Sequence, residues 1–142
     1  MGRRRIPTGT PITKALACGM LEDGGRVLFL VRTDRNGIAR IELPSVIVPS
    51  GRSPFADIKE AFGKLTGIAD YEVHEPIAEG RHNAGSRRRR SWVPAMAFKI
   101  TARNRTAKPS SEFSGFRWLS LDDAKKERPG WNLEWLIRKT GK

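Results

Sequence analysis

The sequence predicts an α/β fold, in which a mixed β-sheet carries helices on both faces. Three observations predict it. Short apolar runs separated by turns that contain Gly or Asn recur along the chain and indicate strands. One segment, residues 54–66, changes to a helical period of three and four. Further strand and helix patterns follow it, which favours helices packed on a sheet. We expect one domain at residues 14–142, since this length suits a single core.

The first part of the chain indicates strands joined by tight turns. Apolar runs at residues 15–21 and 26–32 flank the turn residues 23–25, which predicts a hairpin. A second turn at residues 34–37 contains an Asn-Gly pair, which supplies the positive φ that tight turns need. The run at residues 38–43 then reads as the next strand.

Residues 54–66 predict an amphipathic helix. Ser53 is placed to cap its first turn, Pro54 suits the first helical position, and Gly67 suits the end. Four apolar residues share one face at helical spacing: Phe55, Ile58, Phe62 and Leu65. This face is expected to pack on the sheet.

The second half predicts three more strands and two helices. The strands are expected at residues 71–79, 91–101 and 116–120. A short helix is expected from Leu121, and a C-terminal helix at residues 131–139. Three tryptophans are interpreted as packing residues rather than platforms for bases: Trp118, Trp131 and Trp135.

The balance of charge is the strongest bulk signal. The chain has 27 Lys and Arg against 15 Asp and Glu, which gives a net charge of +12 at pH 7. Such a surface attracts polyanions through its long-range field and through counterion release. We therefore expect RNA, a ribonucleoprotein or nucleotides as partners; a charge that only maintains solubility is the alternative. Residues 1–13, with three adjacent arginines and two prolines, are expected to form a basic flexible arm.

The sequence predicts neither membrane insertion nor secretion. No apolar run approaches the roughly 20 residues that span a bilayer, and no apolar segment follows the basic start before Pro7. The single Cys18 has no partner for an internal disulfide and is expected to be a small buried residue. We therefore expect no membrane partner and a cytoplasmic location.

The sharpest positive feature is the run of four arginines in SRRRRSW. Arg87, Arg88, Arg89 and Arg90 lie between two predicted strands, and Trp92 follows them. Because neighbouring residues on a strand alternate faces, the four can form one surface only if the run is a loop. Arginines beside an aromatic ring suit RNA phosphates and bases. The alternative for this segment is a solvated charged loop.

The segment LPSVIVPSGRSPFADIKEAFGKLTGI resembles the Nudix hydrolase family. The resemblance rests on Leu43-Pro44, Gly51, Pro54 and the ending Gly67-Ile68, in the order strand, loop and helix. It implies a Nudix-like α/β/α sandwich with a mixed β-sheet. That family carries the box G-x5-E-x7-R-E-U-x-E-E-x-G-U, where U is bulky and aliphatic.

This box is degenerate in the present sequence. With its last two positions on Gly67-Ile68, the bulky position falls on Phe62 and keeps its apolar character. The four carboxylate positions fall on other residues: Arg52, Ala61, Lys64 and Leu65. Mg²⁺ needs several hard oxygen ligands aimed at one point, and these side chains offer none. Arg52 and Lys64 are instead expected to hold phosphate by charge.

These observations leave more than one function open. The first hypothesis is a Nudix-fold binding module without metal-dependent hydrolysis, for which no cofactor is predicted. The alternative is an active hydrolase of a nucleoside diphosphate derivative that uses Mg²⁺ or Mn²⁺ with unconventional ligands, for which the candidates are Asp57, Glu60 and Glu112. A structural subunit of a larger assembly is the third hypothesis. Nudix proteins are often dimers, so the resemblance also leaves a homodimer open.

Overall fold

The computed structural model describes residues 14–140, with side chains described to residue 138, and the predicted arm at residues 1–13 lies outside this part. Seven strands and three helices make up the described residues: β1 (Ala15–Asp23), β2 (Arg26–Thr33), β3 (Ala39–Glu42), β4 (Ser45–Val48), α1 (Pro54–Thr66), β5 (Tyr71–Asn83), β6 (Trp92–Ala102), β7 (Gly115–Leu119), α2 (Leu121–Ala124) and α3 (Glu134–Thr140). Among them, no helix is long and apolar enough to cross a bilayer.

The sheet is mixed, as predicted, and β1 lies at its centre. The main strand order is β3-β2-β1-β6-β5, while β4 also pairs with β1 and β7 with β2. β1 is parallel to β6 and antiparallel to β4. The predicted hairpin of β1 and β2 therefore pairs only at its tip, at Glu22–Val27 and Asp23–Arg26. The rest of β1 is paired with β4 and β6, which leaves β2 to pair with β3 and β7.

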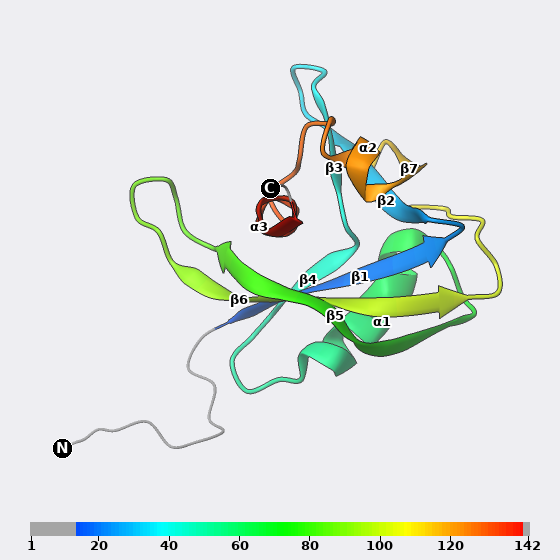
Figure 1. The fold of residues 1–142 in the computed structure, drawn as a ribbon, viewed down its shortest axis with the longest axis horizontal. Helices are drawn as coiled ribbons and strands as arrows, with labels where there is room; N and C mark the ends of the chain where they lie inside the picture. The colour runs from blue at the N-terminus through cyan, green and yellow to red at the C-terminus, as the bar shows by residue number, and fades with distance from the viewer. Residues whose placement is uncertain (1–13, 141–142) are drawn as a thin grey trace.

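The side chains of β1 alternate between the two faces of the sheet. Leu16 and Cys18 belong to a buried cluster with Trp135 of α3, whereas Leu21 packs with Phe62 of α1. This period of two is that of a strand buried on both faces. Figure 1 shows α1 on one side of the sheet and α3 on the other. The α/β/α arrangement is therefore confirmed.

Helix α1 has the bounds that the sequence predicted. The Ser53 side chain accepts a hydrogen bond from the backbone N–H of Ala56, and Pro54 opens the first turn. Gly67 ends the helix at φ 76°, where it donates its N–H to the Gly63 carbonyl at 2.8 Å. A left-handed glycine at this position closes a helix without a Cβ clash.

Two expectations for the C-terminal region are wrong. The helix α3 begins at Glu134 rather than at residue 131, and Trp131 is 46% exposed rather than packed. The segment before α3 is held to β3 instead, because the Gly130 N–H donates to the Ile41 carbonyl at 2.7 Å. The expected burial of Cys18 is confirmed, and burial raises the pKa of its thiol to about 12.

Candidate functional site

The four arginines lie in the loop between β5 and β6, as the sequence predicted, and we call this the arginine loop (Arg87–Arg90). Short polar side chains organise its backbone. The side-chain Oδ1 of Asn83 accepts hydrogen bonds from the backbone N–H groups of Gly85 and Ser91 at 3.0 and 2.9 Å, and the Arg89 N–H donates to the Ser86 hydroxyl at 2.9 Å. These bonds fix the backbone of the loop without involving the arginine side chains.

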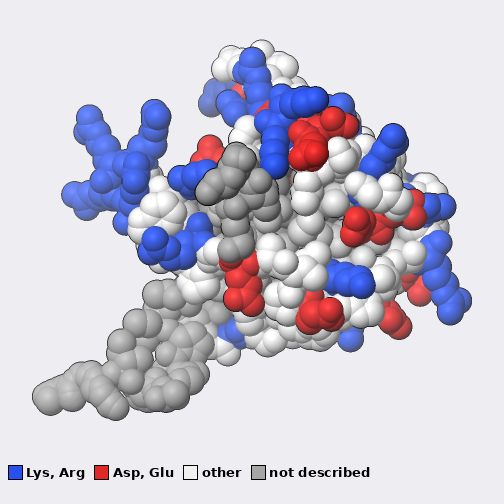
Figure 2. All heavy atoms as spheres, viewed as in Figure 1, with Lys and Arg blue, Asp and Glu red and all other residues white. Residues whose placement is uncertain are grey.

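All four side chains of the arginine loop are exposed. Within residues 14–138, none of them forms an ion pair with a carboxylate. Figure 2 shows them as a cluster of positive side chains that projects from the body of the protein, at the place of the β5–β6 loop in Figure 1. The loop therefore presents uncompensated charge to solvent.

Trp92 stands beside this loop at the start of β6, and two further arginines contact it. It is 38% exposed, and the guanidinium carbons of Arg81 and Arg138 lie 5.3 and 6.0 Å from the centroid of its ring. At these distances a cation is attracted by the ring quadrupole. The basic surface thus extends from the arginine loop onto α3 through Trp92.

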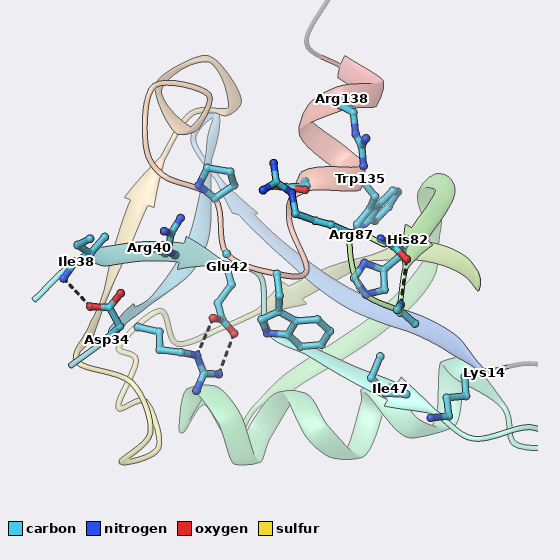
Figure 3. A pocket seen from close by; sticks show the side chains of 18 residues that line it. Lys14, Asp34, Ile38, Arg40, Glu42, Ile47, His82, Arg87, Trp135 and Arg138 are labelled. Carbon is cyan, nitrogen blue, oxygen red and sulfur yellow. Dashed lines mark hydrogen bonds and ion pairs between the residues drawn. The ribbon is translucent and has the colours of Figure 1, made fainter. Parts of the chain in front are cut away.

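A pocket of about 720 Å³ adjoins the arginine loop and is called the basic pocket below. Strands β3 and β4, the end of β5, the start of the β5–β6 loop and the segment that leads into α3 all contribute to its wall. Figure 3 shows Arg40, Glu42, His82 and Arg87 among the side chains around it. Five cations and three acids line it: Lys14, Arg32, Arg40, Arg87, Arg138, Asp34, Glu42 and Glu134.

A buried ion pair fixes one wall of the basic pocket. Glu42 is 3% exposed, and its two oxygens accept hydrogen bonds from Nε and Nη2 of Arg32 at 2.9 and 3.1 Å (Figure 3). Arg32 also contacts Glu112 at 3.3 Å and lies 4.8 Å from the Phe113 ring centroid. The hydrogen bond to Glu42 raises the pKa of Arg32 above its ordinary value. This pair neutralises the one carboxylate that the pocket buries.

Trp131 and His82 form the aromatic part of the basic pocket. Their ring centroids are 5.5 Å apart at an interplanar angle of 67°, which is an edge-to-face contact. His82 is 6% exposed, while Trp131 is 46% exposed. Burial lowers the pKa of His82, and the nearby Glu134 partly opposes that shift. Burial therefore favours the neutral form of the His82 ring, against which Trp131 packs.

The lowered pKa of His82 predicts a pH-dependent stability. As pH falls below about 6.5 the unfolded chain takes up a proton at this histidine while the folded protein resists it, so the free energy of unfolding decreases. In His82→Gln this decrease should be smaller, as measured by urea unfolding between pH 8 and 5. His74→Gln is the control, because the His74 ring lies outside the pocket and bonds to Thr101. Equal pH dependence in His82→Gln and the wild type would contradict the expectation.

The predicted phosphate ligands Arg52 and Lys64 lie apart from the arginine loop. Arg52 precedes α1 and makes a bidentate contact with Asp57, with Nη2 2.7 Å from Oδ1. This contact raises the pKa of Arg52 and lowers that of Asp57. Lys64 pairs with Glu60, one helical turn earlier, at 3.4 Å. Both cations are therefore partly compensated, and neither lines the basic pocket.

The three carboxylates proposed for an unconventional metal site each face a different cation. Asp57 faces Arg52, Glu60 faces Lys64, and Glu112 faces Arg32. None of the three lines the basic pocket. Across the described part of the chain, no group of three or more His, Cys, Asp or Glu is placed to hold a metal ion. The donor set therefore does not fit Mg²⁺ or Mn²⁺, which need several oxygens at one point.

Comparison with solved structures identifies the fold. A Nudix hydrolase of Nitrosomonas europaea superposes with a TM-score of 0.65 at 11% identity, over 90% of this chain and 88% of that one. The Nudix domain of Shewanella oneidensis NrtR, solved with ADP-ribose, gives 0.61 at 15% identity over 96% and 92%. An Ap4A hydrolase of C. elegans gives 0.61 at 17% identity over 90% and 93%. No family model and no curated protein matches the sequence.

Proposed function

Because the chain has the Nudix fold but lacks carboxylates at the positions where that family carries them, we propose that it binds RNA and does not carry out metal-dependent hydrolysis. The RNA is bound either free or within a ribonucleoprotein. The observation that carries the proposal is the arginine loop, four exposed guanidinium groups with no carboxylate partner among the described residues. Arginine is the side chain best suited to phosphate, because its planar fork donates two parallel hydrogen bonds.

The surroundings of the arginine loop support RNA rather than a small anion. Trp92, Arg81 and Arg138 continue the positive surface away from the loop, so that several phosphates can be contacted at once. Each phosphate that is neutralised releases counterions, and the gain accumulates along a polymer. A single small anion would use only one part of this surface.

The degenerate helix supports the second half of the proposal. The positions that carry metal ligands in Nudix hydrolases hold Arg52, Ala61, Lys64 and Leu65 here, and the nearest acids are paired with cations. Positive side chains at these positions repel a divalent ion. What the scaffold retains is a rigid frame for the arginine loop and for the pocket beside it.

Photo-cross-linking tests where RNA binds. A single-stranded RNA that contains 4-thiouridine is irradiated with the full chain, and cross-linked peptides are identified by mass spectrometry. The proposal predicts cross-links concentrated in residues 81–92 and in α3. Cross-links confined to the exposed face of α1 would overturn it.

Turnover assays test the absence of hydrolysis. We expect no Mg²⁺- or Mn²⁺-dependent release of phosphate or nucleoside monophosphate from a panel of nucleoside diphosphate derivatives, because the carboxylates do not converge. Metal-dependent turnover that Glu60→Gln abolishes would contradict this expectation. Glu22→Gln, on the exposed end of β1, is the matched control.

A further inference from the structure

We infer that an RNA strand held by the arginine loop continues to a second group of arginines at the opposite edge of the sheet, so that the protein prefers single strands long enough to reach both. The second group is called the turn cluster and consists of Arg35, Arg40 and Arg128. The inference rests on the proposed function, since it adds a separate phosphate contact for the same ligand and thereby sets the length of RNA that binds best.

The turn cluster is assembled at the β2–β3 turn. Arg35 lies in the turn itself, and Arg40 lies in β3. Arg128 belongs to the segment before α3, which is bonded to β3 because the Ile41 N–H donates to the Arg128 carbonyl at 2.9 Å. Figure 2 shows positive side chains gathered at the place that this turn has in Figure 1, apart from the arginine loop. Two distant segments of the chain therefore bring their arginines to one end of the molecule.

The charge of the turn cluster is not compensated. Its three side chains are exposed, and none of them forms an ion pair with a described carboxylate. The acids that precede them in the sequence have other partners. Asp34 accepts two backbone N–H groups of the turn on its Oδ1 at 2.8 and 3.0 Å, and Glu127 pairs with Arg117 at 2.9 Å. The three guanidinium groups are therefore available to phosphate.

Strand pairing places one of these charges where it costs stability. Arg40 lies directly opposite Arg32 in the antiparallel register of β2 and β3, so that both side chains leave the same face of the sheet. Like charges in such a pair destabilise it. Arg32 is neutralised by Glu42 and Glu112, whereas Arg40 has no such partner. A phosphate bound at Arg40 would supply the missing negative charge.

The basic pocket lies between the turn cluster and the arginine loop. β3 and β5 are the outer strands of the main sheet order, so the two groups of arginines are at opposite edges. Figure 3 shows Arg40 on one side of the pocket, and Arg87 with Arg138 on the other. One phosphate group cannot contact both sides of a pocket of about 720 Å³. A polymer that carries a phosphate at every nucleotide can contact both.

A single strand suits this arrangement better than a duplex does. A positive surface that follows the backbone binds single strands with little sequence preference. A single strand is flexible enough to pass from one edge of the sheet to the other, whereas a duplex is stiff over the length of a short site. The turn cluster therefore adds affinity only when the strand is long enough to leave the arginine loop and reach it.

A length series tests the inference. The affinities of the wild type and of a variant with Arg35→Ala, Arg40→Ala and Arg128→Ala are measured for oligouridylates of about 4 to about 16 nucleotides. The variant should bind the shortest strands as the wild type does, which also shows that it is folded, and the longest about tenfold or more weakly. Since each phosphate on a single strand contributes about 0.7 to the slope of log K against log salt, the slope for the longest strands should fall by up to about 2.

The matched control replaces three exposed cations outside both groups by alanine: Lys59, Lys99 and Lys108. It should retain most of the wild-type affinity at every length. Wild-type affinity of the turn-cluster variant for the longest strands would overturn the inference and leave the proposed function intact. A loss that is the same at every length, or the same in the control, would also overturn it, because the turn cluster would then act only through net charge. Failure of the wild type to bind any strand would overturn the proposed function as well.

Discussion

Replacing the four residues of the arginine loop by alanine is expected to weaken RNA binding more than tenfold near 0.1 M salt. Because each phosphate neutralised on a single strand contributes about 0.7 to the slope of log K against log salt, the slope should fall by up to about 3. The fold should be unaffected, since these side chains are exposed and make no ion pair within residues 14–138. Fluorescence anisotropy of a labelled single-stranded RNA over a salt series measures both quantities.

Two control variants separate the position of the charge from its amount. In the first, four exposed cations elsewhere are replaced by alanine, so that the net charge falls equally: Arg26, Lys59, Lys99 and Lys108. It should retain most of the affinity and of the slope. In the second, the four arginines of the arginine loop are replaced by lysines, which keep the charge but lose the planar fork of the guanidinium group. This variant should bind RNA more weakly than the wild type, with the same slope of log K against log salt. Equal losses in the loop variant and the first control would show that only net charge matters.

Phe62→Ala is expected to lower the free energy of unfolding by about 3–5 kcal/mol. Phe62 is fully buried between α1 and the sheet, with its ring centroid 4.9 Å from that of Tyr71. Gly19 of β1 leaves room for this ring, since a Cβ at Gly19 would come within 2.9 Å of it. Truncation therefore leaves a cavity whose walls, β1 and β6, are held by their own strand pairing. Chemical denaturation measures the loss.

The matched control is Phe55→Ala on the same helix. Phe55 is 41% exposed and makes one edge contact, with a centroid distance of 5.9 Å to Phe98. Its loss should cost about 1 kcal/mol or less. If the two variants were equally stable, α1 would not pack as described, and the frame that positions the arginine loop would be in question.

Local chemistry made helix α1 predictable from the sequence. Ser53, Pro54 and Gly67 mark its ends through bonds within a few residues, and the apolar spacing marks its buried face. The start of α3 could not be predicted in this way. There the Asn132 side chain donates to the Leu43 carbonyl at 3.1 Å, and the segment is fixed to β3 by contacts far along the chain. Those contacts hold Trp131 out of the helix that its sequence pattern suggested.

In the candidate site, too, some features are set by neighbouring residues and others by contacts between distant segments. The arginine loop is one continuous run, so that its position between two strands and its exposure followed from the sequence. The basic pocket is assembled from His82, Trp131 and Arg138, which come from three separate segments and meet only through the sheet order. The turn residues Pro129 and Gly130 indicated a turn just before Trp131, but they did not show where the helix begins. Nothing local indicated that Arg52 would pair with Asp57.

The most direct test of the account measures wild-type binding of a labelled single-stranded RNA over a salt series, once with EDTA and once with Mg²⁺. The account predicts tight binding at low salt and a steep linear fall of log K with log salt. The binding curves measured with EDTA and with Mg²⁺ should agree, apart from the competition of Mg²⁺ for phosphate. The RNA should be intact at the end of both series. No binding at low salt, or binding that needs Mg²⁺ and consumes the RNA, would contradict it.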